Sequence, residues 1–246
     1  MGIAHLVPLI VPALFLTFVA AERLWPARPL PTVRFWRLKG IFFFALSGFL
    51  SSTVPALYVD FIRAHRLMNL EGLGVAGGAA VGFLAIELVG YFWHLVRHRS
   101  GLLWRLTHQM HHSAERLDIF GATYLHPLDL VGTNLVLGVV TTMVLGLSVD
   151  AAALVSILGI GCAMFQHTNI RTPRWLGYLV QRPESHSVHH ARGIHAGNYS
   201  NVPVWDMLFG TFQNPARFEA ETGFYQGASR RIGAMLVGRD VSSIRR

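Results

Sequence analysis

The chain has 246 residues, of which 52% are hydrophobic and only 14% are charged. This composition is too apolar for a disordered segment and unusual for a water-soluble domain, so burial in a bilayer is the leading explanation. The single cysteine, Cys162, excludes an intrachain disulfide scaffold, a cysteine-ligated zinc finger and a four-cysteine iron–sulfur cluster. The 13 histidines, as many as all carboxylates together, are the unusual feature.

Four apolar stretches are candidates for membrane helices. Residues 3–21, 41–59 and 73–93 each approach the roughly 20 residues that cross about 30 Å of hydrocarbon as a helix. A further stretch, residues 130–165, is interrupted by Ser-Val-Asp at residues 148–150, which predicts a turn between two shorter helices. These two helices would form a hairpin that either spans the membrane or re-enters it.

The first stretch has two interpretations, a retained span or a cleaved signal peptide. A signal peptide carries Lys or Arg before its apolar run, whereas this run has none before it and contains Pro8 and Pro12. A retained span is therefore favoured.

Lys and Arg are distributed unevenly between the predicted loops. Residues 60–72 carry only Arg63 and Arg66, whereas residues 22–40 carry Arg23, Arg28, Arg34, Arg37 and Lys39. Since cytoplasmic loops retain Lys and Arg, we expect the N-terminus outside, and the region after the third span and the C-terminus in the cytoplasm. All of the 21 Lys and Arg except Arg63 and Arg66, that is 19, then lie on the cytoplasmic side. The formal charge of +8 is therefore explained as a signal that orients the chain in a bacterial-type inner membrane. No nucleic-acid partner is expected, because no basic helix has DNA-reading character.

The third stretch carries glycines at four-residue spacing, Gly74, Gly78 and Gly82. Such a ridge of small residues allows close helix packing, and packing against another span of the same chain is favoured over homodimerisation. We expect N-terminal transmembrane helices over residues 1–72, a domain with the third span, the histidines and the hairpin over residues 73–212, and a basic tail over residues 213–246. The tail is expected along the membrane face, and the oligomeric state is left open.

Nine of the histidines fall into spaced groups. His94 and His98 lie four residues apart at the end of the third span, so a helix stacks both imidazoles on one face. After a predicted break at residues 100–101, residues 102–115 are expected to form an amphipathic helix. The pattern His-x-x-His-His then occurs twice, each time with its three imidazoles expected on one helical face, and a lone histidine follows the hairpin. These positions are His108, His111 and His112, then His167, then His186, His189 and His190, which follow a helix start at Pro183.

This spacing predicts metal binding. Crowded imidazoles repel one another if protonated, and the chain has few carboxylates to compensate them, whereas a metal accepts neutral imidazole as ligand. Nine histidines exceed what one ion coordinates, so two ions are predicted, and the hairpin between His112 and His167 returns the chain to the same side. Imidazole suits Zn, Cu, Fe and Ni alike, although a closed structural zinc site would have four ligands, usually including Cys.

A pair of metals at the membrane boundary favours a substrate that is itself a lipid. Iron with open coordination positions activates dioxygen and removes hydrogen from unactivated C–H bonds, which leads to hydroxylation or desaturation. Soluble di-iron proteins use inward-facing carboxylates, so the ligand set here is different. Two alternatives are a membrane metal transporter or sensor, which would place ligands through several spans, and a dizinc membrane hydrolase, in which metal-bound hydroxide attacks an ester or amide.

At these residues the chain resembles the fatty acid hydroxylase/sterol desaturase superfamily of integral-membrane, non-haem di-iron oxidoreductases. The matching histidine boxes run over residues 91–98, 103–113 and 186–190. The resemblance covers roughly residues 83–212 and also includes His126-Pro127-Leu128-Asp129, His167-Thr168-Asn169, Asn198-Tyr199 and residues 205–212.

The resemblance implies an all-α, multi-span transmembrane bundle with a cytoplasmic, histidine-rich metal-binding cap. It implies two Fe ions ligated by the nine histidines, O2 as co-substrate, and a membrane lipid as substrate. Electrons would come from a separate ferredoxin or cytochrome b5-like donor, because no Gly-rich dinucleotide fingerprint follows a strand here.

The chain departs from the common pattern at His167, which has Ala163 four residues before it. The tenth ligand is therefore open between His126, His195 and water. Glu87, seven residues before His94, is a candidate to hydrogen-bond a ligand imidazole, with a bond to a neighbouring helix as the alternative. Asp206 is a candidate for the same role, with a turn or cap role as the alternative.

Overall fold

The computed structural model describes residues 2–243, and over this range it consists of helices and connecting segments with two isolated β-bridges. Arg245 and Arg246 of the predicted tail lie outside the described residues. The all-helical class expected from the sequence is therefore confirmed.

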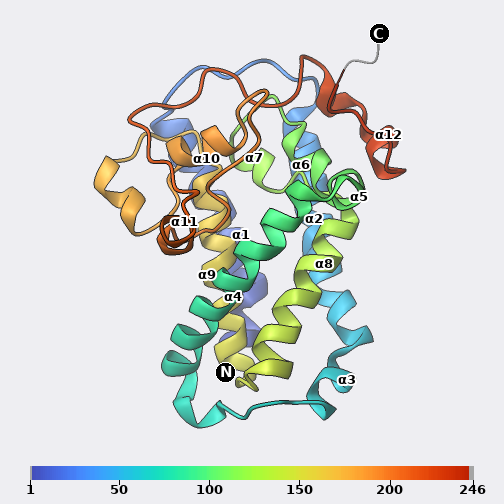
Figure 1. Cartoon of the computed structure of the whole chain (residues 1–246), viewed down its shortest axis with the longest axis vertical. Coiled ribbons are helices and arrows are strands. Elements are labelled where there is room, and N and C mark those ends of the chain that lie inside the picture. The colour runs from blue at the N-terminus through green and yellow to red at the C-terminus, as the bar shows by residue number, and fades with distance from the viewer. Residues whose placement is uncertain (1, 244–246) are drawn as a thin grey trace.

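Five long apolar helices form the body of the molecule (Figure 1). The shortest candidate spans have 18 residues, which corresponds to about 27 Å at a rise of about 1.5 Å per residue, close to the hydrocarbon thickness of a bilayer. Both arms of the predicted hairpin thus have the length and composition of spans, and the chain is an integral membrane protein. The helices are α1 (Val7–Leu24), α2 (Trp36–Thr53), α4 (Gly74–Arg99), α8 (Pro127–Gly138, continued by the π-helix Val139–Val144) and α9 (Val149–Gln166).

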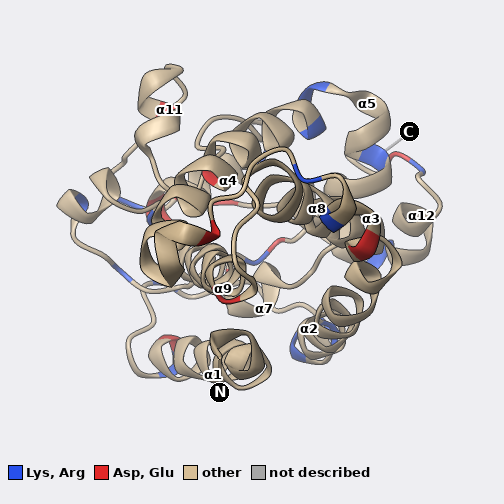
Figure 2. Cartoon of the chain, turned by 90° about the horizontal axis from the view of Figure 1, so that it is seen from below, with Lys and Arg blue, Asp and Glu red and all other residues tan. Residues whose placement is uncertain are grey.

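Consecutive long helices run in opposite directions, which separates the connections into two ends. Residues 3–6, residues 58–73 and residues 145–148 lie at one end, while residues 25–35, residues 100–126 and residues 167–243 lie at the other (Figure 1). Figure 2, viewed along the bundle, shows how few residues of the long helices are charged. The end without the histidine groups has only Arg63 and Arg66 as Lys or Arg, as the sequence predicts. The cytoplasmic assignment of the histidine end stays a prediction.

The glycine ridge of α4 packs against α9 and the turn before it. A Cβ on Gly82 would lie 2.6 Å from Leu147 Cδ1 and 2.9 Å from Val155 Cγ2, and one on Gly78 would lie 3.0 Å from Ala151 Cβ. The expected packing against a span of the same chain is therefore confirmed at these two positions. Gly74 has no such neighbour and instead begins the helix with a φ of +66°.

Short helices and loops cap the end of the bundle that carries the histidine groups. One of these, α6, ends at His112, so the expected amphipathic helix over residues 102–115 is wrong in its end. Its exposed side chains are confined to Leu102 and Arg105, because every residue from Thr107 to Glu115 is buried. The predicted break at Ser100 is confirmed, because its hydroxyl caps α5. The short helices are α3 (Val59–Ala64) at the opposite end, and α5 (Gly101–Leu103), a π-helix (Trp104–His108), α6 (Gln109–His112), α7 (Ile119–Ala122), α10 (Pro183–His189), α11 (Val204–Leu208) and α12 (Ile232–Leu236) in the cap.

The predicted tail forms part of this cap. Phe224 and Met235 are buried in one apolar cluster with Trp36, Met110 and Tyr124. Gln109 also binds the tail, donating to the carbonyl of Arg239 at 2.8 Å. The C-terminal segment is therefore packed against the elements that carry the histidines.

Candidate metal centre

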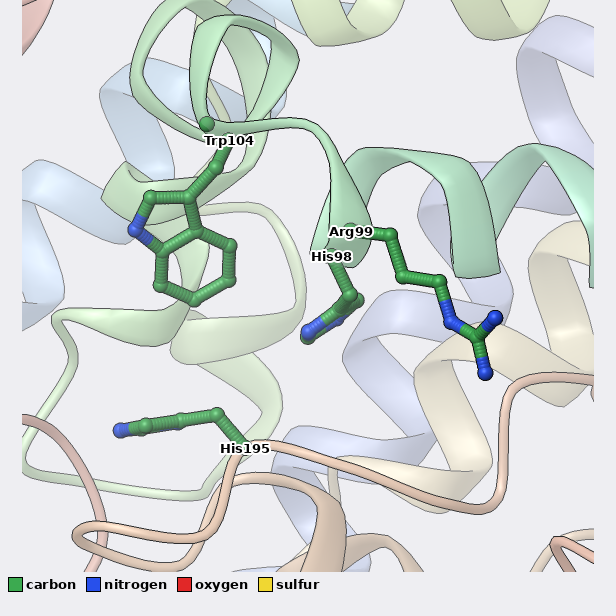
Figure 3. Close-up of a pocket in the computed structure, with 5 residues that line it drawn as sticks. His98, Arg99, Trp104 and His195 are labelled. Carbon is green, nitrogen blue, oxygen red and sulfur yellow. The ribbon is translucent and has the colours of Figure 1, made fainter.

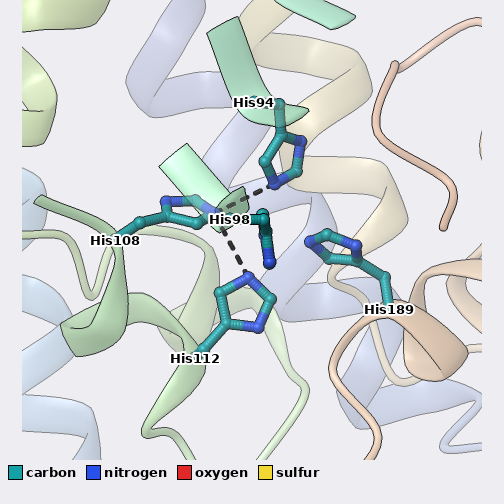
Figure 4. A group of neighbouring side chains, drawn as sticks. All are labelled: His94, His98, His108, His112 and His189. Atoms are coloured by element: carbon teal, nitrogen blue, oxygen red, sulfur yellow. Dashed lines mark hydrogen bonds between the residues drawn. The ribbon is translucent and has the colours of Figure 1, made fainter. Parts of the chain in front are cut away.

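Nine buried or half-buried histidines converge in two adjacent groups, and in each group one side-chain atom per residue lies within 4.8 Å of all the others. Figure 4 shows the rings of the first group pointing toward one another from α4, the π-helix, α6 and α10. The first group consists of His94, His98, His108, His112 and His189, and the second of His111, His167, His186 and His190. These are the nine histidines singled out by their spacing.

The helical geometry divides each His-x-x-His-His motif between the two groups. Residues i and i+4 of a helix lie nearly on one face, whereas residue i+3 is rotated to the other side of the i position. His108 and His112 accordingly enter the first group while His111 enters the second, and in α10 the pair His186 and His190 enters the second while His189 enters the first. The expectation that each triplet shares one face is thus too coarse, because the two motifs contribute reciprocally to both groups.

Hydrogen bonds to carbonyl oxygens fix the protonation of several rings. Nδ1 of His94 donates to the carbonyl of Tyr199 at 2.7 Å, that of His189 to Gly197 at 2.7 Å, and that of His167 to Ala163 at 2.6 Å. Since a carbonyl only accepts, these Nδ1 atoms carry the proton and each neutral ring presents a lone pair at Nε2. Gly197 supports this arrangement with a φ of +78°, and a Cβ there would lie 3.0 Å from the carbonyl oxygen of Thr211.

The spacing of the Nε2 atoms fits bound metal. Nε2 of His108 lies 2.9 Å from that of His94 and 3.2 Å from that of His112. In the second group, Nε2 of His167 lies 3.0 Å from that of His111 and 3.1 Å from that of His186. Metal–nitrogen bonds of about 2.0–2.1 Å place neighbouring ligand nitrogens about 3 Å apart when the bonds meet near a right angle. Facing lone pairs at this distance repel unless a cation lies between them, so the donor set fits one metal ion in each group.

Burial keeps the imidazoles neutral. Desolvation, followed by repulsion from neighbouring imidazoles, lowers the pKa of His111, His112, His186 and His190 well below its ordinary value. Burial also lowers the pKa of His167 to about 4. At neutral pH these rings are therefore unprotonated and available as ligands.

A buried carboxylate holds the first group in place. Oδ2 of Asp129 accepts from His108 Nδ1 at 2.9 Å, and its other oxygen accepts from Arg97. The side chains of Arg97 and Asp129 are only 11% and 2% exposed, so this is a buried ion pair. Sequence reasoning did not single out Asp129 as a site residue, although it closes the His-Pro-Leu-Asp stretch noted above; only the fold brings it to His108.

Glu87 and Asp206 lie outside both histidine groups and hold the loop that carries Tyr199. The Glu87 carboxylate accepts from the backbone N–H and the side-chain amide of Asn201, at 2.9 and 2.8 Å. Asp206 accepts from the N–H of Tyr199 at 2.7 Å and from that of Ser200 at 2.9 Å. Their link to the site therefore runs through the Tyr199 carbonyl that binds His94.

The two candidates for a tenth ligand lie in different places. His126 is the N-cap of α8, where its Nδ1 accepts from the N–H of Leu128 at 3.1 Å, and it belongs to neither group. His195, with a left-handed φ of +44°, lies beside the first group, and its Nδ1 is 3.2 Å from Nδ1 of His112. Burial lowers the pKa of His195 to about 4.

A cavity of about 290 Å³ opens beside the first group. Figure 3 shows the rings of Trp104, His98 and His195 bordering it. It gives the first group a route to the exterior, whereas all four histidines of the second group are buried.

The fold and the site define the class of the protein: a helical membrane protein with two adjacent all-histidine groups at one end of its bundle. Comparison with known proteins specifies the class further, because the family model "Fatty acid hydroxylase" matches residues 79–211, over half of the chain. The chain belongs to this family, as its histidine pattern predicts.

Curated relatives support the assignment. The chain is 29% identical over 142 residues to ornithine lipid hydroxylase OlsE of Rhizobium tropici, which covers 56% of this chain and 42% of that protein. It is 22% identical over 168 residues to sphinganine C4-monooxygenase 1 of Arabidopsis thaliana, an alignment that covers 67% of this chain and 65% of that protein. It is 26% identical over 139 residues to a very-long-chain aldehyde decarbonylase of Oryza sativa, an alignment that covers 53% of this chain and 52% of that protein. The chain thus spans 42% to 65% of the length of these relatives, and no solved structure matches it.

Proposed function

We propose that this protein is a non-haem di-iron oxidoreductase that hydroxylates a C–H bond of a membrane lipid. The observation that carries the proposal is the convergence of nine imidazoles in two adjacent groups at one end of a membrane bundle. Both groups consist of histidine alone, whereas closed four-ligand structural zinc sites usually include cysteine.

In this proposal the nine histidines hold two iron ions, which supply oxygen activation and removal of hydrogen from a C–H bond. Other residues of the chain orient these histidines. The carbonyls of Tyr199, Gly197 and Ala163 keep protons on Nδ1, so that Nε2 is free to bind. Asp129 does the same for His108 while neutralising Arg97.

The cavity bordered by Trp104 and His195 is the proposed approach of the reacting carbon to the first group. Hydroxylation inserts one atom of O2 into the C–H bond and releases the other as water. This needs two electrons and two protons from outside the chain. We propose a separate ferredoxin or cytochrome b5-like donor at the histidine end, which we assign to the cytoplasm.

The lipid substrate is supported by the names of the relatives, two of which are hydroxylases of an ornithine lipid and of sphinganine. Those names also favour hydroxylation over desaturation. The rival function of metal transport fits the structure less well, because the described histidine groups lie at one end of the bundle instead of along the spans.

Lipid analysis tests the proposal. The chain, expressed in a bacterial host with iron and a reducing partner, should produce lipids heavier by one oxygen; lipids lighter by two hydrogens would indicate desaturation instead. The variants His111→Ala and His189→Ala, one from each group, should lose both the product and bound iron. The control His65→Ala removes a histidine at the other end of the bundle and should keep both.

Metal analysis separates the proposal from a dizinc hydrolase. We expect about two iron ions per purified chain, one for each intact histidine group. Two retained zinc ions together with ester or amide hydrolysis in the absence of oxygen would refute the proposed reaction.

A further inference from the structure

An apolar groove of about 420 Å³ lies between α2 and the C-terminal α12, apart from the histidine groups. Leu38, Phe42 and Leu46 of α2 form one side and Ile232 and Leu236 of α12 the other. Among the described residues that line it, Lys39 is the only charged or polar one. The volume lies within the range of about 300–1,000 Å³ that ligand sites occupy.

The groove occupies the part of the bundle where the bilayer core meets the cap. Leu46 lies eight residues after Leu38, a rise of about 12 Å along α2, which begins at Trp36 on the histidine side. Leu38 and Phe42 are 64% and 61% exposed, as expected for side chains that face lipid. A hydrocarbon chain bound in this groove would begin at the level of the lipid headgroups, beneath α12, and run toward the centre of the bilayer.

The end of the groove at Lys39 is positively charged. Nζ of Lys39 donates one long hydrogen bond, 3.4 Å, to the carbonyl of Ser229, although an ammonium has three donors. The charged groups that act on it are Glu115 and Arg230. Glu115 already accepts hydrogen bonds from Gly227 and Ser229. Two cations against one carboxylate leave an excess of one positive charge at the end of the groove.

We propose that the groove binds one hydrocarbon chain of an anionic membrane lipid, with its acidic headgroup against Lys39. The apolar walls select a hydrocarbon chain, and the excess charge selects a negative headgroup over a zwitterionic one. An occupied groove would join α2 to α12, and the C-terminal segment continues from α12 to Gln109, next to the ligand His108. The lipid would therefore stabilise the docking of this segment onto the cap. The proposal does not depend on the reaction proposed above.

Native mass spectrometry of the full chain in mild detergent tests it, with phosphatidylglycerol and phosphatidylcholine of the same acyl chains as probes. We expect phosphatidylglycerol to be retained about fivefold more than phosphatidylcholine, since the attraction of one lysine to an anionic lipid strengthens binding by about fivefold. Lys39→Gln should abolish this preference, and Lys39→Arg should retain it.

Two variants fill the groove. Leu46→Trp and Leu236→Trp should each remove the retained lipid, and Leu236 lies at the surface of α12, where the larger ring is tolerated in folding. The control Leu16→Trp, on the lipid-facing side of α1, should retain lipid as the parent chain does. Retention that is equal in the groove-filling variants and the control would overturn the proposal. His111→Ala should retain lipid normally, so a failure of the proposed reaction leaves this result unchanged.

Discussion

The contact of Asp129 with His108 makes a quantitative prediction about metal binding. Replacing Asp129 by Asn keeps the shape of the side chain but removes its charge, and an amide oxygen cannot serve both His108 and Arg97 as two carboxylate oxygens do. Loss of a partner that orients a ligand histidine weakens metal binding by about 10–100-fold. We expect Asp129→Asn to weaken one of the two metal equivalents by this factor, because His108 belongs to the five-histidine group alone.

The same variant should be less stable. Arg97 would remain buried without its counter-charge, and breaking a buried pair costs about 3–5 kcal/mol. Both effects are measured on the purified protein, the first by titration against a metal-binding dye and the second by thermal unfolding without metal.

Asp118→Asn is the matched control. Asp118 is also buried and paired with an arginine, Arg116, but it contacts no histidine and its partner is 23% exposed. It should lose some stability and keep both metal equivalents at their normal affinity. The reasoning is refuted if Asp129→Asn binds both equivalents normally, or if Asp118→Asn weakens them as much.

Further predictions concern pH, packing and orientation. The pKa of His167 is about 4 in the folded chain against about 6.5 unfolded, so His167 by itself should account for about 3 kcal/mol of the stability that the metal-free protein loses as pH falls from 6.5 to 4. A His167→Gln variant that loses as much stability in acid as the parent chain, measured by unfolding, would contradict this. Gly82→Ile should cost about 1–3 kcal/mol by collision with Leu147 and Val155, whereas Gly90→Ile, which meets no neighbour, should melt normally. Reporters at the two ends should show the N-terminus outside and the C-terminus in the cytoplasm, and a reversed result would overturn the charge argument.

Much of the architecture was predictable because it depends on local periodicity and composition. Apolar stretches of about 20 residues become helices in a bilayer whatever their neighbours are, since only internal hydrogen bonds satisfy the backbone there. The glycine spacing in α4 predicted a close helix contact, and the histidine spacing predicted metal groups and the family. Ser100 and Pro183 marked helix starts by their local chemistry.

The assignment of each histidine to one of two groups was decided by the tertiary structure. Helix geometry separates His111 from His112, but the other histidines that each of them joins depend on the rotation of their short helix, α6, against α4, α9 and α10. The π-helical turn that ends at His108 directly precedes this short helix and contributes to its rotation, because a π-helical turn contains one more residue than an α-helical turn.

The contacts that tune the site were also beyond sequence reasoning, because they join residues far apart in the chain. Asp129 reaches His108 across 21 positions, and the carbonyl of Tyr199 reaches His94 across 105. The sequence by itself therefore determined the membrane helices, the family and the chemical type of the ligands. The tertiary structure decided which histidines share a group, which carboxylate contacts them, and how the C-terminal segment and α2 form an apolar groove.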